Sequence, residues 1–220
     1  YIKKLYYHIF LLFHVDRKSQ MNTNIDSSKM QVTRQKIIKC FLELYAEQPF
    51  EQIRIKSLAE VIGINRGTFY LHFLDLNDLI ESIEDEQMKV IANIGKQFRY
   101  FYYSEKTDEF AQFFKAIFDY IVKNKEVFKI LTSPHSRPNF RESFLEMMRN
   151  NSKQKYHSIL VQAKGKELLK KEYMIESIIN GNLGVILCWI QSNINLTTEE
   201  LAEFMSYTVL KSPLEIMKSK

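Results

Sequence analysis

Residues 53–80 read IRIKSLAEVIGINRGTFYLHFLDLNDLI, and this stretch decides the fold of the N-terminal part of the chain. Leu58 and Ile62 lie on one apolar stripe at helical spacing. A glycine then interrupts the pattern, and Phe69 and Phe73 resume it four residues apart. The stretch therefore predicts a helix, a tight turn and a second short helix, followed by a longer helix.

The face opposite this stripe is polar and carries cationic, hydroxyl and amide groups. Its residues are Asn65, Arg66, Thr68, Tyr70 and His72. Two short helices around a buried turn, with cations, hydroxyls and a phenol pointing outward, are typical of a helix-turn-helix that reads DNA. The alternative is an ordinary amphipathic helical hairpin in which these polar residues have no special role.

The same stretch resembles the N-terminal domain of the TetR/AcrR family of bacterial transcriptional regulators. The matching positions, about 50 of the 220 residues, are Ile37 to Phe41, Phe50, Ile55, Leu58-Ala59, Gly63-Ile64, Arg66 to Tyr70, His72-Phe73 and Asp78-Leu79. The resemblance implies an all-α, cytoplasmic homodimer without a cofactor. Its N-terminal domain would bind a palindromic operator in double-stranded DNA, and its C-terminal domain would bind a small-molecule effector.

In this interpretation, the helix at about 66–72 lies in the major groove of DNA. Arg66 can donate two hydrogen bonds to guanine O6 and N7, and Gly67 leaves room for the backbone to approach the bases. We expect base contacts from Asn65, Arg66, Gly67, Thr68 and Leu71. We expect phosphate contacts from Arg34, Arg54, Lys56, Ser57, Tyr70 and His72, of which the last two are implied by the resemblance.

Two positions depart from the family pattern. The family usually has a phosphate-contacting lysine near the start of the next helix, where this chain has Leu74, Asp75 and Leu76. Arg54 stands where Ser or Thr usually caps the first short helix, and it forfeits a cap worth roughly 0.5–2 kcal/mol. One phosphate contact is therefore expected to be missing. As alternatives, Tyr70 is a half-buried packing residue and His72 an ordinary surface histidine.

Composition supports an all-α fold with a modest local basic surplus. The 220 residues include only six Gly and four Pro but 16 Phe and 12 Tyr. The net charge of +5 comes from residues 1–20 (+3) and 211–220 (+2), so the residues between them sum to zero. Within residues 29–72, seven Lys or Arg face four Glu, which suits a phosphate-contacting surface.

Apolar periodicity and breakers divide the rest of the chain into further helices. The predicted helices span about 32–47, 56–62, 66–72, 76–96, 107–124, 126–132, 138–164, 168–194 and 198–211. Residues 1–29 are interpreted as an extension that is disordered or precedes the natural start at Met21, with 21–29 as a flexible lead-in. The alternative is a short membrane-surface helix. A DNA-binding domain is predicted over 30–78 and a regulatory and dimerisation domain over 79–220.

The last two predicted helices suggest a homodimer. Their apolar faces include Ile179, Leu183, Ile186, Leu187, Ile190, Leu201, Phe204 and Met205, and Gly181 and Gly184 allow close helix approach. The segment from Gly184 to Trp189 and the run from Glu200 to Phe204 are similar to regulators of dihydroxyacetone kinase genes. The alternative is that these helices only complete a monomeric core.

An effector pocket is predicted from aromatic and amphipathic side chains. The candidates are Tyr102, Phe114, Phe118, Tyr156, His157 and Trp189, with ordinary core packing as the alternative. The five histidines are far apart in sequence, so no metal is expected. The chain has neither a phosphate-binding loop nor a nucleophile elbow, which argues against an enzyme. Cys40 and Cys188 are expected to pack as small hydrophobes in a reducing compartment.

These observations favour a homodimeric repressor that a small molecule releases from its operator. Two alternatives remain open: a related regulator that is controlled by a protein partner or acts as a coactivator, and a helical interaction protein that has lost DNA binding. The repressor that a small molecule releases requires an enclosed cavity. The regulator that binds a protein partner requires an exposed apolar patch of several hundred Å².

Overall fold

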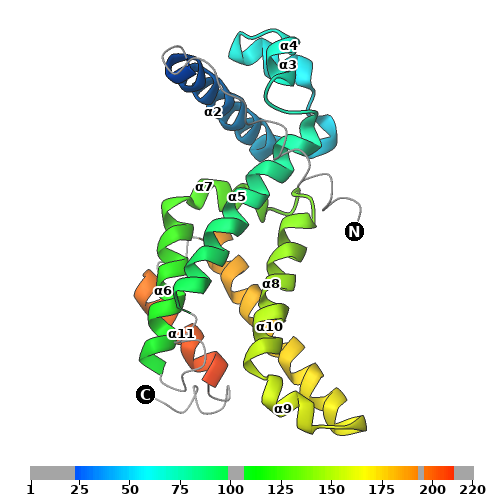
Figure 1. The fold of residues 1–220 in the computed structure, drawn as a ribbon, viewed down its shortest axis with the longest axis vertical. Coiled ribbons are helices and arrows are strands. Elements are labelled where there is room, and N and C mark those ends of the chain that lie inside the picture. Colours follow the sequence, from blue (N-terminus) through cyan, green and yellow to red (C-terminus); the bar gives the residue numbers. More distant parts are fainter. Residues whose placement is uncertain (1–22, 99–106, 193–195, 211–220) are drawn as a thin grey trace.

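The computed structural model describes residues 23–98, 107–192 and 196–210, and every regular element within them is helical. Figure 1 shows a small group of helices at one end, joined by one long helix to a larger bundle. The all-α prediction is therefore confirmed for the part of the chain that the structure describes.

The small group, which we call the head, comprises three helices and one short turn. They are α2 (Thr23–Glu47), the 3-10 turn η1 (Phe50–Gln52), α3 (Ile55–Ile62) and α4 (Arg66–Tyr70). The head closes around side chains that are at most 3% exposed: Ile37, Phe41, Tyr45, Leu58, Phe69 and Phe73. The apolar stripe seen in the sequence is thus the inward face of the head.

Helix α5 (Leu76–Gln97) leaves the head and runs down into the bundle (Figure 1). The Asp78 N–H donates to Asp75 Oδ1 at 2.9 Å, and Asp78 Oδ2 accepts from the Leu74 N–H at 2.8 Å. This reciprocal cap confirms the predicted start of the helix. One face of α5 is buried in both parts, through Ile80 near the head and Ile91 in the bundle.

The bundle, which we call the body, consists of six helices. They are α6 (Thr107–Lys123), α7 (Lys125–Leu131), α8 (Asn139–Lys155), α9 (His157–Gln162), α10 (Gly165–Gln191) and α11 (Thr198–Leu210). Helix α6 packs against α5 and α11, and α10 packs against α7, α8 and α11. Buried phenylalanines dominate the core, and the rings of Phe114 and Phe118 stack with centroids 6.0 Å apart.

Several predicted boundaries differ from the structure, and three of them concern the candidate sites or the N-terminus. Helix α2 begins at Thr23, so the expected flexible lead-in is helical from that residue. The helix predicted over 138–164 is broken at Tyr156, where the backbone leaves helical geometry between α8 and α9. Helix α4 ends at Tyr70 rather than His72. Residues 1–22 lie outside the described residues, and the boundary between residues 78 and 79 stays a prediction because α5 runs through it.

The dimer-face residues are placed differently from the prediction. Six of the eight are at most 4% exposed within the single chain: Ile179, Leu183, Ile186, Ile190, Leu201 and Met205. They fill the core because this side of α10 faces α7 and α8, and α11 packs chiefly on α6. Leu187 is half-buried, and Phe204 is 38% exposed. The outward side of α10 instead carries Gly181, Gly184 and an exposed Cys188, which corrects the expectation that this cysteine is buried.

The segment Lys166–Gln191 of α10 is long and apolar enough to cross a membrane, judged by length and hydropathy alone. Its most buried side chains, including Ile179 and Leu183, belong to the core of the body. Only 28% of its most apolar window is buried, so core packing accounts for part of its apolar character.

Candidate functional site

The turn between α3 and α4 is fixed by Gly63. This residue has φ +76°, a left-handed conformation that disfavours side chains with a Cβ. Its N–H and that of Ile64 both donate to the Ala59 carbonyl at 3.0 Å, which closes the end of α3. The chain can therefore reverse within two residues and start α4 at a fixed angle.

Asn65 caps α4. Its Oδ1 accepts hydrogen bonds from the Thr68 N–H at 2.7 Å and from the Thr68 hydroxyl at 3.1 Å. A Cβ at Gly67 would lie 3.1 Å from this same oxygen, so glycine leaves room for the cap. Asn65 Oδ1 thus serves the cap, while its amide N–H groups remain for the expected base contact, which stays a prediction.

A shallow groove on the head brings together five of the predicted DNA-contacting residues. It is lined by Ile53, Arg54, Ile55, Lys56, Ser57, Arg66, Tyr70 and Leu76. Arg66 is exposed on α4, and Tyr70 one turn later is 54% exposed, so both side chains can reach a ligand. Leu71 is 74% exposed at the end of α4, and Thr68 is half-buried.

The polar side chains of this groove keep most of their freedom. Lys56 lies 3.9 Å from Glu60 with both side chains about two-thirds exposed, a geometry that contributes little and leaves the ammonium available. Arg54 donates to the carbonyl oxygens of Glu51 and, at 3.0 Å, of Ile53. It makes no side-chain cap for α3, as predicted. The groove therefore presents three cations and two hydroxyl groups.

Arg34 and His72 lie outside this groove. The Arg34 guanidinium lies 5.0 Å from the Phe73 ring centroid and donates to the Ser82 hydroxyl at 3.3 Å. It thus holds α2 against α5, and the expected phosphate contact of Arg34 stays a prediction. His72 is half-buried, and burial, with a further contribution from Arg34, lowers the pKa of its imidazole. An uncharged imidazole can offer a phosphate only an ordinary hydrogen bond.

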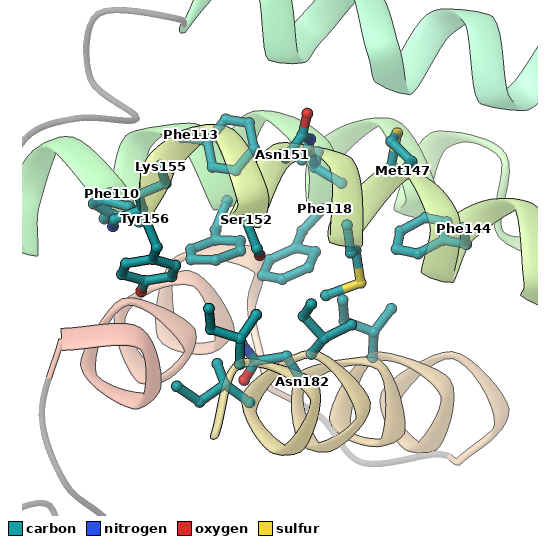
Figure 2. Close-up of a pocket in the computed structure, with 17 residues that line it drawn as sticks. Phe110, Phe113, Phe118, Phe144, Met147, Asn151, Ser152, Lys155, Tyr156 and Asn182 are labelled. Atoms are coloured by element: carbon teal, nitrogen blue, oxygen red, sulfur yellow. The ribbon is translucent and has the colours of Figure 1, made fainter. Parts of the chain in front are cut away.

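The body contains a partly open cavity of about 80 Å³ between α6, α8 and α10 (Figure 2). Three of the predicted pocket residues line it: Phe114, Phe118 and Tyr156. Trp189 lies behind the wall, with its ring centroid 5.4 Å from that of Phe118 and its indole N–H donating to the Leu196 carbonyl at 3.1 Å. His157 is exposed at the start of α9 and is not part of the lining. Tyr102 lies outside the described residues.

Sequence reasoning missed the contribution of α8 to the cavity. This helix supplies Phe144, Met147, Met148, Asn151, Ser152 and Lys155, and α10 adds Asn182. A signal was present, because Asn182 stands in the middle of the apolar run of α10 and is only 6% exposed. A buried amide in such a run indicates a polar partner or a polar cavity. One polar partner of Asn182 is Thr208, whose hydroxyl donates to Asn182 Oδ1 at 2.9 Å.

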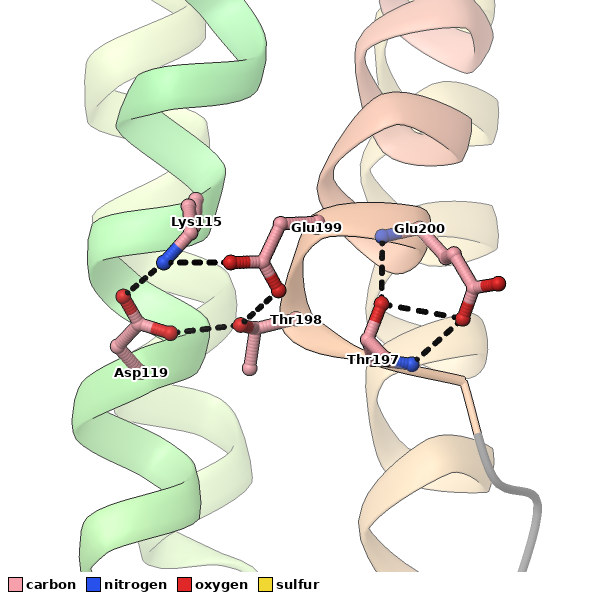
Figure 3. Close-up of polar contacts among 6 residues, drawn as sticks. All are labelled: Lys115, Asp119, Thr197, Thr198, Glu199 and Glu200. Carbon is pink, nitrogen blue, oxygen red and sulfur yellow. Dashed lines mark hydrogen bonds and ion pairs between the residues drawn. The ribbon is translucent and has the colours of Figure 1, made fainter.

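Helix α11 is held on α6 by a polar network that fixes the outer side of the body (Figure 3). Lys115 pairs with Asp119 at 2.7 Å and with Glu199 at 3.0 Å, and the Thr198 hydroxyl donates to Asp119 at 2.6 Å. The ammonium of Lys115 lowers the pKa values of both carboxyl groups. The predicted start of this helix at about residue 198 is confirmed, and the Thr197 N–H donates to Glu200 Oε2 at 2.8 Å.

Arg137, in the loop between α7 and α8, joins the head to the body. Its N–H donates to the Tyr45 hydroxyl at 2.8 Å, and its guanidinium lies 5.1 Å from the Phe50 ring centroid. Its side chain also donates to Asn77 Oδ1 at 3.3 Å and lies 3.8 Å from Glu81. The sequence analysis left this segment between the helices predicted over 126–132 and 138–164. The signal was weak: a single cation between two prolines.

The structure thus has a small helical head with an exposed helix-turn-helix and a larger helical body with a cavity, and this architecture alone does not decide the function. Residues 108–211, which span most of the body, match a TetR family described as "Transcriptional regulator C-terminal region". The match places this C-terminal region in the TetR family of transcriptional regulators. No curated protein matches it.

Proposed function

We propose that the protein is a homodimeric, sequence-specific DNA-binding repressor that a small-molecule effector releases from a palindromic operator. The observation that carries this proposal is the exposed groove of the head. There Arg54, Lys56 and Ser57 from α3 and its N-terminal flank meet Arg66 and Tyr70 from α4. Cations and hydroxyl groups beside a short exposed helix are the groups that a phosphate backbone and guanine edges require.

Within this proposal the groups have separate roles. Arg66 donates to a guanine in the major groove, and Leu71 meets a thymine methyl. Lys56, Ser57 and Tyr70 contact phosphates. Arg54 adds positive charge beside the same DNA strand. The phosphate-contacting lysine of the family falls in the segment where this chain has Leu74, Asp75 and Leu76, and Leu74 is 80% exposed. The proposed contact set is therefore smaller by one cation.

Release of DNA is proposed to pass through two connections between cavity and head. Helix α5 is continuous from the head into the body. Helix α8, which forms one wall of the cavity, begins two residues after Arg137, whose contacts with Tyr45 and Phe50 reach the head. A ligand that displaces α8 would thus also displace the head. Each tenfold loss of DNA affinity requires about 1.4 kcal/mol of differential binding.

Dimerisation is proposed to use the outward face of α10. A Cβ at Gly181 or Gly184 would meet nothing within 4 Å in the part of the chain that the structure describes. Each glycine costs about 0.5–1 kcal/mol relative to alanine within a helix, and single-chain packing does not require it. Close approach of a second copy would explain both glycines. Sedimentation should therefore show Gly184→Arg as a monomer, whereas Gly95→Arg, at an equally open glycine of α5, should stay dimeric.

Fluorescence anisotropy tests DNA binding directly. The chain is titrated onto labelled DNA tiled from beside its own gene, with Arg66→Ala and Lys170→Ala in parallel. Lys170 is exposed on α10 at the far end of the molecule and loses the same charge. We expect saturable, salt-dependent binding to one palindromic tile, weakened by about 1–3 kcal/mol in Arg66→Ala alone. Equal losses of affinity in both variants would contradict sequence-specific binding through Arg66. If no tile bound and selection from random-sequence DNA also yielded no site, DNA binding would be refuted.

A second candidate is control by a protein partner, favoured by exposed apolar side chains where α9 meets α10. Val161, Tyr173 and Met174 are each more than 60% exposed there. A reporter assay in cells separates the two candidates. Tyr173→Ser with Met174→Ser should leave regulation intact if a small molecule controls the protein, and should abolish it if a partner docks at this end.

A further inference from the structure

We infer that the cavity of the body takes a small uncharged molecule that is apolar over most of its surface and carries one oxygen facing Ser152 and Asn182. This inference deepens the proposed function, because its regulatory meaning rests on that function. The binding event itself requires no DNA.

The apolar part of the ligand follows from the walls. Phenylalanines of α6 and α8 face isoleucines of α10 across the cavity: Phe114, Phe118, Phe144, Ile179 and Ile186. The volume of about 80 Å³ is smaller than the roughly 150 Å³ of a dry cavity that binds benzene. Two methionines of α8 also line the space, and their unbranched thioether side chains can adapt to a ligand. The ligand is therefore limited to about one ring or a short branched chain.

The walls present no charge to a ligand in the part of the chain that the structure describes. Lys155 is the charged residue among those that line the cavity, but its ammonium nitrogen is buried within the wall. That nitrogen lies 3.7 Å from the ring centroid of Phe110 and 5.6 Å from that of Tyr156, so its charge is already engaged. A charged ligand would lose its hydration without gaining an open group of opposite charge, which costs far more than burying a neutral group. The ligand is therefore uncharged.

Two neutral polar groups interrupt the apolar walls. Figure 2 shows the Ser152 side chain pointing from α8 toward α10, where Asn182 lies. Asn182 is only 6% exposed, and its Oδ1 accepts from the Thr208 hydroxyl at 2.9 Å, which leaves the N–H groups of the amide to a further partner. Buried donors require an acceptor, and the Ser152 hydroxyl can donate to the same one. One oxygen of a ligand between α8 and α10 would serve both residues.

Met147 and Met148 provide a direct readout of the occupied cavity, because both line it. The full chain is prepared with carbon-13 in its methionine methyl groups, and Met147→Leu and Met148→Leu assign the two NMR signals. A ligand in the cavity should shift both signals saturably. Because these signals arise inside the body, they report binding whether or not the head binds DNA.

The experiment titrates the full chain with three probes of one shape. They are methyl isopropyl ketone, isobutyrate and isobutyramidine, which are neutral, negative and positive at neutral pH. The ketone should bind saturably, and both ions should bind at least about a hundredfold more weakly, because each would have to give up its hydration. If either ion bound as tightly as the ketone, or if the ketone produced no saturable shift, the inference would be overturned.

A double variant assigns the ligand oxygen to its two partners. The comparison probe is the alkene that carries a methylene group in place of the ketone oxygen. Ser152→Ala with Asn182→Leu should lower the affinity for the ketone relative to the alkene by about tenfold. The alkene should bind this variant at least as tightly as the wild type, which shows that the cavity is intact. Ser158→Ala with Asn180→Leu, at exposed positions of α9 and α10, should leave the affinity ratio unchanged.

An unchanged ratio in the cavity variant, or an equal fall in the surface variant, would contradict the inference. If the cavity variant no longer bound the alkene, Ser152→Ala alone would serve, since it removes one hydroxyl group and adds no bulk. This single change should lower the ratio about threefold, and an unchanged ratio would again contradict the inference. Ketone binding without operator binding would instead refute only the proposed regulator function.

Discussion

In the head of this protein, the candidate functional side chains lie outside the core, whereas in the body they are part of the core. In the head, the polar groove residues lie on the outside of two short helices, and the core behind them uses apolar side chains, of which Ile53 also lines the groove. In the body, Phe114 and Phe118 are both core residues and cavity walls. Function and stability can therefore change independently in the head, but they are coupled in the body.

Adjacent residues of α4 give the largest test of this separation. Phe69 is fully buried, whereas Tyr70 is 54% exposed in the groove. Phe69→Ala should lower the free energy of unfolding by about 3–5 kcal/mol, because it leaves a cavity in the small core of the head. Tyr70→Ala should change it by no more than about 0.5 kcal/mol. Urea denaturation followed by circular dichroism measures both.

The separation would fail if Tyr70→Ala were as destabilising as Phe69→Ala. In that case, Tyr70 would be the half-buried packing residue that the sequence left open as an alternative. Any loss of DNA affinity in Tyr70→Ala would then follow from lost stability of the head.

The head could be predicted from sequence because its information is local. One run of 28 residues contains the turn glycine, the cap and the apolar stripe, and the structure assembles them almost in sequence order. What could not be predicted was that contacts within the protein already engage some of the side-chain groups expected to contact DNA. Asn65 Oδ1 is used by the cap, and the guanidinium of Arg34 is used by Phe73 and Ser82.

The body was predicted as helices but not as a site. Its cavity joins α6, α8 and α10, and nothing in the local pattern states which apolar face of α10 meets which helix. The same stripe was therefore assigned to a dimer interface, although Ile179 and Ile186 line the cavity. Lys155 was missed because a lysine near the end of a helix has the appearance of a solvated residue.

Glu84, on α5 where the two regions meet, gives the next largest effect. It is 8% exposed, and burial raises the pKa of its carboxyl group to about 7, against a partial opposing effect of Arg137. Glu81 and Asp85 raise it further. Between pH 4.5 and 7, the folded state keeps a proton that the unfolded state releases, so stability falls as the pH rises through this window.

Glu84→Gln mimics the protonated carboxyl group and should remove this loss. The variant should match the wild type near pH 4.5 and exceed it by roughly 1–3 kcal/mol at pH 8. Denaturant melts across this range measure the difference. A constant offset between the two proteins at every pH would show that Glu84 does not titrate in the fold.

Arg137→Ala should loosen the head while leaving the body intact. The change removes the guanidinium from Phe50, Asn77 and Glu81 but keeps the backbone N–H bond to Tyr45. We expect hydrogen exchange of the α2 and α3 amides to rise about fivefold, which corresponds to roughly 1 kcal/mol. Arg141→Ala, an exposed cation of α8, is the matched control. A uniform rise through head and body in Arg137→Ala would argue for global destabilisation instead.

The smallest effect separates two explanations of Gly67. A Cβ there would lie 3.1 Å from Asn65 Oδ1, the oxygen that caps α4. Asn65→Ala alone should cost about 1 kcal/mol of stability. If glycine serves the cap, Gly67→Ala should be destabilising in the wild type. It should become neutral or stabilising beside Asn65→Ala, where alanine's better helix propensity dominates. The coupling energy of this double-mutant cycle is expected to be roughly 0.5–1 kcal/mol.

DNA affinity of the same four proteins then decides what the head uses Gly67 for. If the glycine also admits the DNA backbone, Gly67→Ala should weaken operator binding even beside Asn65→Ala, where the added methyl group no longer disturbs the cap. If affinity instead follows stability through the whole cycle, the glycine is required by the cap alone. The reading surface would then depend on Gly67 only through the position that the cap gives to Arg66 and Tyr70.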